Sequence, residues 1–182
     1  IDDVARTALD CYQKALEETN PRIRHMDWMR GALFAFVICR ALRPLDIFGL
    51  VVGRTLRRDS EGWALYGRAS KNKYRLVGRL WDICTPYLDG AILLGADESQ
   101  LWVAYARAEG RPLLAERTGR PLCENWATEQ FRHFLGTGVG IMRTLGTTTA
   151  PRSAPRRRSG PRSPSGHLQE PEFCRLNGKA TR

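Results

Sequence analysis

The sequence has few residues of the kinds that hold metals or form disulfide networks. Its three histidines, His25, His133 and His167, lie far apart, and its five cysteines are odd in number and contain no Cys-x-x-Cys pair. Zinc ligands are typically clustered at short spacings, so we expect no metal and no other cofactor. The cysteine pattern also disfavours a disulfide scaffold and favours a reducing, cytoplasmic setting.

Long apolar runs are missing as well. The most apolar stretch, from Ala32 to Cys39, is much shorter than the roughly 20 residues that a membrane-spanning helix needs. The chain opens without the successive charged, apolar and small-residue regions of a signal peptide, so we expect no membrane association. Because the first residue is Ile1 rather than Met, we expect a fragment of a longer reading frame.

Acidic residues are too few to balance the basic ones, and the formal net charge is +10. Much of the excess lies in residues 143–182, which contain 9 Lys and Arg against 2 Asp and Glu. Residues 1–142 are nearly balanced but hold one basic concentration, made of Arg54, Arg57, Arg58, Arg68, Lys71, Lys73, Arg75 and Arg79. A basic stripe fits binding to the phosphate backbone of DNA. On charge alone, a solvated charged hairpin explains it equally well.

Hydrophobic spacing predicts the order helices, small sheet, helices. Helical periodicity appears over residues 4–18, 28–42, 45–50, 81–94 and 124–135. Short β-prone runs separated by turn residues predict antiparallel strands at 51–57, 63–66 and 74–80, with one more strand at 101–105. Residues 109–121 are rich in Gly, Arg and Pro and predict an exposed loop. The expected fold class is α+β, mainly helical with a small antiparallel β-sheet.

The composition changes abruptly after about residue 142. The stretch from Ala150 to Gly166 contains Pro, Arg, Ser and Gly, no acidic residue and almost nothing apolar. Such a segment cannot bury enough surface to offset the entropy lost on ordering. We therefore expect residues 143–182 to form a disordered basic tail, residues 21–142 to form the main domain, and residues 1–20 to be the end of an N-terminal helical region or linker.

The most informative motif is Ala-Leu-Arg-Pro-Leu-Asp-Ile-Phe-Gly-Leu at residues 41–50. An apolar helix leads into Arg43, an acidic residue, Asp46, follows three positions later, and Leu50 lies four beyond that. A predicted hairpin then carries Lys71 and Lys73, and Leu-Trp-Val and Gly-Arg-Pro-Leu segments follow at 101–103 and 119–122. This order resembles the catalytic domain of tyrosine recombinases of the phage-integrase type over residues 27–141.

The resemblance implies a chemistry for these residues. In this family a Tyr attacks a DNA phosphodiester and forms a phosphotyrosyl link. Arg43 would clamp the phosphate with its planar fork of donors, and Asp46 would support it. A hairpin Lys would act as general acid on the departing 5′ oxygen, with Lys71 favoured over Lys73 because it is the first Lys of the turn. The implied partner is double-stranded DNA, with no small-molecule substrate and with a homo-oligomer on DNA as an option. The expected DNA contacts are Arg54, Arg57, Arg58, Lys73 and Arg75.

The sequence departs from the family beyond this first half. The second catalytic box, His-x-x-Arg, does not occur, and the last tyrosine is Tyr105, where no nucleophile is expected. We therefore expect catalysis to be incomplete, and the break near Ile141 suggests a shifted reading frame or a degraded gene.

Two other functions stay open. One is a non-catalytic DNA-binding protein that uses the hairpin and the arginines at 156–158. The other is an unrelated α+β interaction domain, in which Arg43 is a surface residue at a helix start and Lys71 is an ordinary turn residue.

Overall fold

The computed structural model describes residues 1–40, 42–71 and 73–138, with only the backbone of Glu124. The predicted tail at 143–182 lies outside these residues. The elements are α1 (Asp2–Glu17), α2 (Pro21–Cys39), α3 (Pro44–Phe48), β1 (Leu56–Asp59), β2 (Gly62–Arg68), β3 (Arg75–Arg79), a 3-10 helix (Asp82–Cys84), α4 (Thr85–Leu93), a second 3-10 helix (Glu98–Gln100), α5 (Leu101–Ala108) and α6 (Glu124–Leu135). The expected class, mainly helical with a small antiparallel sheet, is confirmed.

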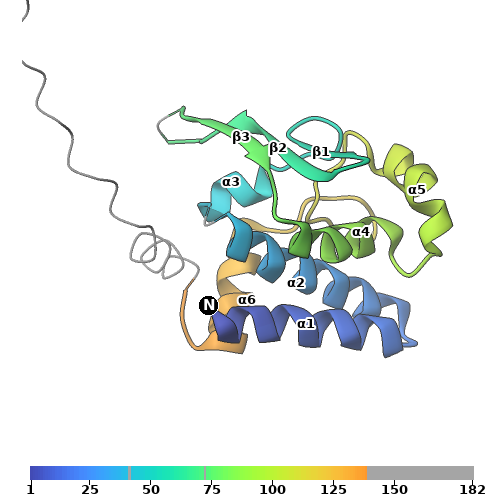
Figure 1. Ribbon diagram of the computed structural model, residues 1–182. Coiled ribbons are helices and arrows are strands. Elements are labelled where there is room, and N and C mark those ends of the chain that lie inside the picture. Colours follow the sequence, from blue (N-terminus) through green and yellow to red (C-terminus); the bar gives the residue numbers. More distant parts are fainter. Residues whose placement is uncertain (41, 72, 139–182) are drawn as a thin grey trace, which may run out of the picture. The chain divides into compact units, whose positions relative to one another are not determined.

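Helix α2 is the centre of the core. It begins earlier than the predicted start at Trp28, because Pro21 suits the first helical position and the Asn20 side chain accepts a hydrogen bond from the Arg22 backbone nitrogen at 3.0 Å. Figure 1 shows the sheet and α4 on one side of α2 and α1 on the other. Residues 1–20, expected as the end of a helical region or a linker, thus pack on this core through Val4, Ala8, Cys11 and Ala15.

Helices α2 and α4 approach closely at a glycine. A Cβ atom built on Gly90 of α4 would collide with the indole ring of Trp28 in α2. Glycine in a helix interior costs roughly 0.5–1 kcal/mol relative to alanine. The close packing of the buried Trp28 ring accounts for the glycine at this position.

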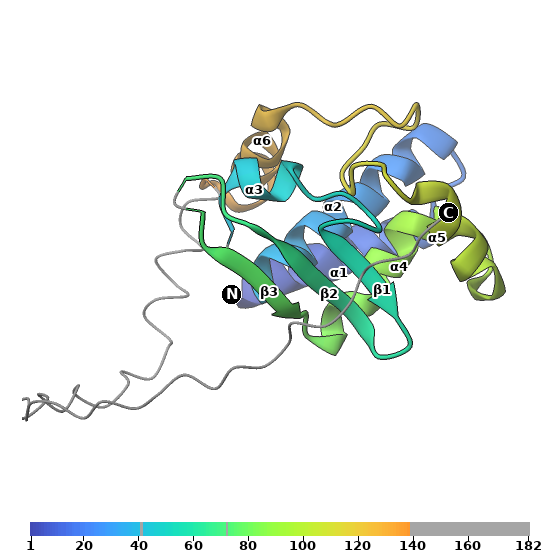
Figure 2. The same cartoon turned by 90° about the horizontal axis from the view of Figure 1, so that it is seen from above.

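The sheet has the order β1-β2-β3, with antiparallel pairing throughout. Leu56 pairs with Leu65, and both side chains are buried in the core on the inner face. The first predicted strand, 51–57, is split: Leu56 starts β1, whereas Val51 and Val52 lie beside the loop at 110–113. Figure 2 shows the sheet from its outer face, with the helices beneath.

The prediction of a strand at 101–105 is wrong, because this segment is the first part of helix α5. Trp102, Val103 and Tyr105 are β-prone as single residues. However, Ala104, Tyr105 and Ala108 share one helical face and pack against the core. Burial of that face overrides the local β-propensity.

The loop prediction at 109–121 is confirmed, but the segment is not wholly exposed. Leu113 and Leu114 are buried, and the Leu113 backbone nitrogen donates to the Leu50 carbonyl oxygen at 2.9 Å. The loop leads to α6, where Trp126 and Phe131 are buried. The Phe131 ring lies 5.0 Å from that of Phe34 in α2.

Cysteine pairing differs from the sequence expectation at one place. Cys39, at the end of the most apolar stretch, is buried, and its sulfur is paired with that of Cys84. The two Cα atoms are 7.2 Å apart, which is wider than the usual span of a disulfide. Among the described residues this is the one cysteine pair, and it links α2 to the first 3-10 helix. None of the helices that the structure describes combines the length and apolarity needed to cross a bilayer.

Candidate nucleic-acid interface

Arg43 lies immediately before helix α3. Its backbone is extended, with φ −74° and ψ 150°, as expected for a residue that precedes proline. Its carbonyl oxygen accepts a hydrogen bond from the Ile47 backbone nitrogen at 3.0 Å, which starts the helix. The side chain is half-buried, and no carboxylate of the described residues lies within ion-pairing distance of it. The Arg43 guanidinium group therefore has donors to offer to a ligand.

Asp46 connects helix α3 to the β2–β3 hairpin. Its carboxylate Oδ1 accepts a hydrogen bond from the Ser70 backbone nitrogen at 2.6 Å. Hydrogen bonds to ionised carboxylates are short and strong, and a carboxylate in the first turn of a helix is also favoured by the helix dipole. The turn that carries Lys71 consequently lies beside the helix that Arg43 precedes (Figure 2).

The hairpin turn exposes both candidate lysines. Backbone hydrogen bonds from Ala69 to Tyr74 at 2.8 Å and from Lys73 to Ala69 at 3.0 Å close the turn. The side chains of Lys71 and Lys73 are exposed. Lys73 has φ 57°, a left-handed conformation that side-chain-bearing residues rarely adopt. The choice of Lys71 over Lys73 as the general acid stays a prediction.

Strand alternation creates a basic outer face on the sheet. Successive side chains of a strand point to opposite faces, so the register places one set of residues together on the outside. We define the outer basic face as Arg57, Tyr66, Arg68, Arg75, Val77 and Arg79, all of which are exposed. The Arg57 guanidinium lies over the Tyr66 ring, 5.1 Å from its centroid.

Charge on the outer basic face is uneven. Arg79 is paired with Asp59 at 2.7 Å and with Glu61 at 2.7 Å, and its hydrogen bonds to Asp59 lower the pKa of that carboxyl group. Arg68 and Arg75 are directly opposite each other on β2 and β3, and no carboxylate of the described residues pairs with either. Like charges opposite each other destabilise a sheet. The unbalanced charge thus lies at the hairpin end, toward Lys71.

Arg58 and Arg54 differ from this arrangement. Arg58 points inward and makes two hydrogen bonds with the Asp89 carboxylate, at 3.1 and 3.2 Å, while the Trp63 indole nitrogen donates to the same carboxylate at 2.7 Å. Arg58 therefore lies in an ion pair with Asp89 and not on the outer basic face. Arg54 is exposed before β1 and lies outside the outer basic face.

The sequence prediction omitted Tyr66 and named Arg68 only as part of the basic concentration. Both belong to the outer basic face because they alternate with buried or half-buried residues along β2. Period-two alternation over residues 62–68 was the signal available, but it could be used only once the register was known.

The described residues include no cluster of three or more His, Cys, Asp or Glu side chains that could hold a metal ion. Comparison with known proteins finds no matching family model, no matching curated protein and no matching solved structure.

Proposed function

We propose that this chain is the phosphate-binding part of a tyrosine recombinase-type catalytic domain, which binds double-stranded DNA and does not cleave it by itself. The observation that carries the proposal is the hydrogen bond between Asp46 and the Ser70 amide. It joins the segment of Arg43 to the turn of Lys71, which are the two segments that the family resemblance assigns to one active site. An accidental sequence match would not require these segments to meet.

The proposed chemistry follows from the charge that develops on phosphorus. Attack on a phosphodiester concentrates negative charge on the phosphate oxygens, and an Arg fork can hold two of them at once. In this proposal Arg43 supplies that fork, and Lys71 would protonate a departing oxygen. Asp46 holds the turn against α3 through the Ser70 amide and so acts as a positioning residue.

Cleavage needs groups that this chain does not contain. It has no His-x-x-Arg sequence and no tyrosine after Tyr105. A nicked suicide DNA substrate incubated with the chain should therefore give no covalent protein–DNA product on a denaturing gel. A stable adduct would contradict the incomplete-site proposal.

Sequencing the gene gives a separate test of the proposed recombinase ancestry. Past codon 141, one of the two other reading frames should encode His-x-x-Arg followed by a later tyrosine. These codons correspond to residues outside those that the structure describes. If neither frame encodes such residues, the frame-shift hypothesis fails.

A second candidate is a non-catalytic DNA-binding protein, which the unpaired Arg68 and Arg75 on the outer basic face favour. The two functions differ in the role of Arg43. If the phosphate site is recombinase-like, Arg43→Lys should weaken binding to a DNA duplex, because an ammonium cannot replace the bidentate fork. If only the outer basic face binds DNA, Arg43→Lys should leave affinity unchanged while Arg75→Ala reduces it. We expect either function to operate in the cytoplasm. The DNA-binding measurements on these variants can also show whether the chain self-associates on DNA.

A further inference from the structure

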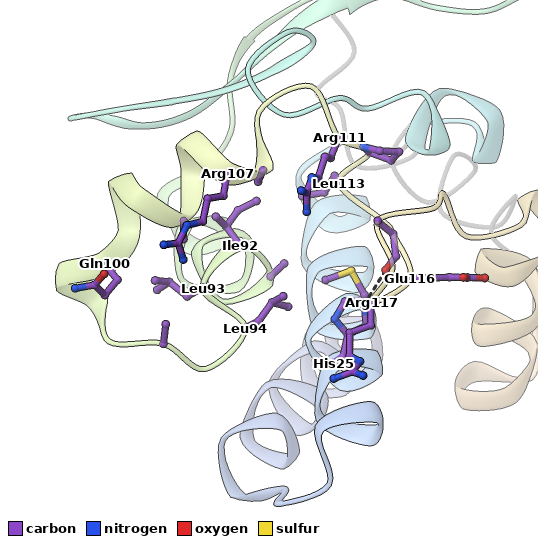
Figure 3. Close-up of a pocket in the computed structure, with 18 of the residues that line it drawn as sticks. His25, Ile92, Leu93, Leu94, Gln100, Arg107, Arg111, Leu113, Glu116 and Arg117 are labelled. Carbon is purple, nitrogen blue, oxygen red and sulfur yellow. Dashed lines mark hydrogen bonds between the residues drawn. The ribbon is translucent and has the colours of Figure 1, made fainter.

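A cavity of about 320 Å³ lies between α2, α4, α5 and the loop at 111–119, and shares no residue with the outer basic face (Figure 3). This volume is at the lower end of the range for small-molecule sites, roughly 300–1,000 Å³. Most of the wall is apolar, with side chains that include Met29, Ile92, Val103, Ala104 and Leu113. The cavity can therefore hold a small ligand with an apolar body.

The charged lining of this cavity has one dominant sign. The lining contains three arginines and only one carboxylate: Arg107, Arg111 and Arg117 against Glu116. No carboxylate of the described residues lies within ion-pairing distance of these three guanidinium groups. In Figure 3, Arg107 and Arg111 lie toward one end of the cavity and His25 and Arg117 toward the other. The charge favours an anion.

His25 adds a buried polar atom without a partner. Its side chain lines the cavity and the residue is only 7% exposed. Its Nε2 lies 2.8 Å from the carbonyl oxygen of Ala115, so Nε2 carries the proton and donates. In the neutral ring Nδ1 is then an acceptor, and among the described residues it has no hydrogen-bond partner. Buried polar atoms nearly always have partners, so this atom points to a donor that the chain itself does not provide.

The rim of the cavity leaves apolar surface uncovered. Val103 of α5 is 46% exposed and Leu94, which follows α4, is 39% exposed. Both would be covered by an apolar group in the cavity. The uncovered rim, the exposed arginines without carboxylate partners and the buried acceptor together describe the chemistry of a ligand that would fit this cavity.

We propose that this cavity binds a small amphipathic carboxylate that also carries a hydroxyl group. Its apolar body packs against Ile92, Val103 and Leu113. Its carboxylate is held at the end formed by Arg107 and Arg111, because a guanidinium fork matches a carboxylate. Its hydroxyl donates a hydrogen bond to Nδ1 of His25. The proposal does not depend on DNA binding, because the outer basic face contributes nothing to this site.

The test uses the 182-residue chain and four probes. These are 3-(4-hydroxyphenyl)propanoate, the same acid without the hydroxyl, its uncharged amide, and inorganic phosphate. In calorimetric titrations the hydroxy acid should bind saturably. Loss of the hydroxyl should weaken binding about fivefold, and loss of the charge about tenfold or more, as expected for a neutral and a charge-assisted hydrogen bond. Phosphate, which lacks an apolar body, should bind far more weakly than the acids.

Substitutions in the cavity wall test whether the hydroxy acid binds in this cavity. Arg107→Gln and Arg111→Gln should each weaken binding of the hydroxy acid, whereas Arg120→Gln, in the same loop but outside the cavity, should not. Ala104→Leu should block the site by filling it. Circular dichroism checks that each variant is folded. In the unaltered chain, the ¹⁵N resonance of His25 Nδ1 should shift when the hydroxy acid binds.

Four results would overturn the proposal. The first is the absence of saturable binding by every probe, and the second is phosphate binding as strong as that of the acids. The third is equal behaviour of the Arg107→Gln, Arg111→Gln and Arg120→Gln proteins. The fourth is a His25 resonance that stays unchanged at saturation, which would mean that the ligand hydroxyl does not reach this atom.

Discussion

The carboxylate Oδ1 of Asp46 lies 2.6 Å from the backbone nitrogen of Ser70. This hydrogen bond joins a helix of only five residues to the end of a hairpin. Neither element is stable alone, because a single helical turn and an isolated hairpin are both marginal in water. The bond thus stabilises the position of the turn relative to Arg43.

Replacement of Asp46 tests this relationship. Asp46→Ala should lower the free energy of unfolding by about 1 kcal/mol, the usual net value of a hydrogen bond. It should also speed hydrogen exchange at the Ser70 amide. Asp46→Asn keeps an oxygen acceptor and should have a smaller effect on both. Urea denaturation and amide exchange by NMR measure these changes, and an unchanged Ser70 exchange rate in Asp46→Ala would contradict the role assigned to Asp46.

Removing one arginine of the opposed pair Arg68 and Arg75 should have opposite effects on the stability of the protein and on its affinity for DNA. Arg75→Ala removes like-charge repulsion across the strands and should raise stability by about 0.2–1 kcal/mol. The same change should weaken DNA binding and reduce the slope of log affinity against log salt by about 0.9 for each phosphate that is no longer neutralised. Arg79→Ala is the matched control on the same strand and face. Because Arg79 is paired with Asp59 and Glu61, its removal should reduce stability and change the salt slope less.

The ion pair of Arg58 and Asp89 should be structural. The two side chains are 13% and 17% exposed, and Trp63 donates to the same carboxylate. Asp89→Ala leaves Arg58 without its partner and should cost about 2–3 kcal/mol, somewhat less than for a fully buried pair. Arg58→Met keeps the packing of the side chain and should cost less. Arg58→Met should also leave DNA affinity unchanged, whereas Arg57→Met should lower it. A drop in the DNA affinity of Arg58→Met would show that Arg58 contributes to DNA binding.

Replacing each of two helical glycines by alanine should have opposite effects on the stability of the protein. Gly90→Ala should destabilise the protein by about 1–3 kcal/mol, because the new methyl group overpacks the Trp28 ring. Gly31→Ala is the control, since its Cβ would meet its neighbours at 3.6 Å, an ordinary van der Waals distance. This change should be neutral or stabilising by up to about 1 kcal/mol, because alanine is the better helix former. Thermal unfolding of both proteins gives the comparison.

Cys11 should be unreactive in the folded state. Burial raises the pKa of its thiol from 9.0 to about 11, and the nearby charge of Asp27 acts in the same direction. Iodoacetamide at pH 8.5 should therefore modify the exposed Cys123 and spare Cys11 until the protein unfolds. Mass spectrometry of the proteolytic peptides separates the label on Cys11 from that on the other cysteines, and rapid native labelling of Cys11 would contradict its burial.

The same pKa shift has a consequence for stability. The folded state holds the Cys11 proton more tightly than the unfolded state does. Its contribution to stability is therefore complete below about pH 9 and is lost as the pH rises toward 11. Urea denaturation at pH 8 and pH 10.5, with and without Cys11→Ala, measures this contribution.

Sequence reasoning predicted helices α1 and α6 and the presence of the sheet, because each depends on a local pattern. Apolar spacing along 4–18 and 124–135 has the helical period, and turn residues separate the β-prone runs. The approach failed at residues 101–105. There, single-residue β-propensity opposed a helical face that becomes visible only when Ala104, Tyr105 and Ala108 have a core to pack against.

The sequence by itself determined which residues could take part in binding: a basic segment at 54–79, Arg43 before a proline, and Asp46 three positions later. Only the tertiary structure decided which of them act together. Arg57 and Arg58 are neighbours in the chain, but strand register places one on the outer basic face and the other in an ion pair with Asp89. The cavity beside His25 likewise combines α2, α5 and a distant loop. Local patterns set the secondary structure, whereas the pairing of strands and the burial of distant segments set which side chains meet.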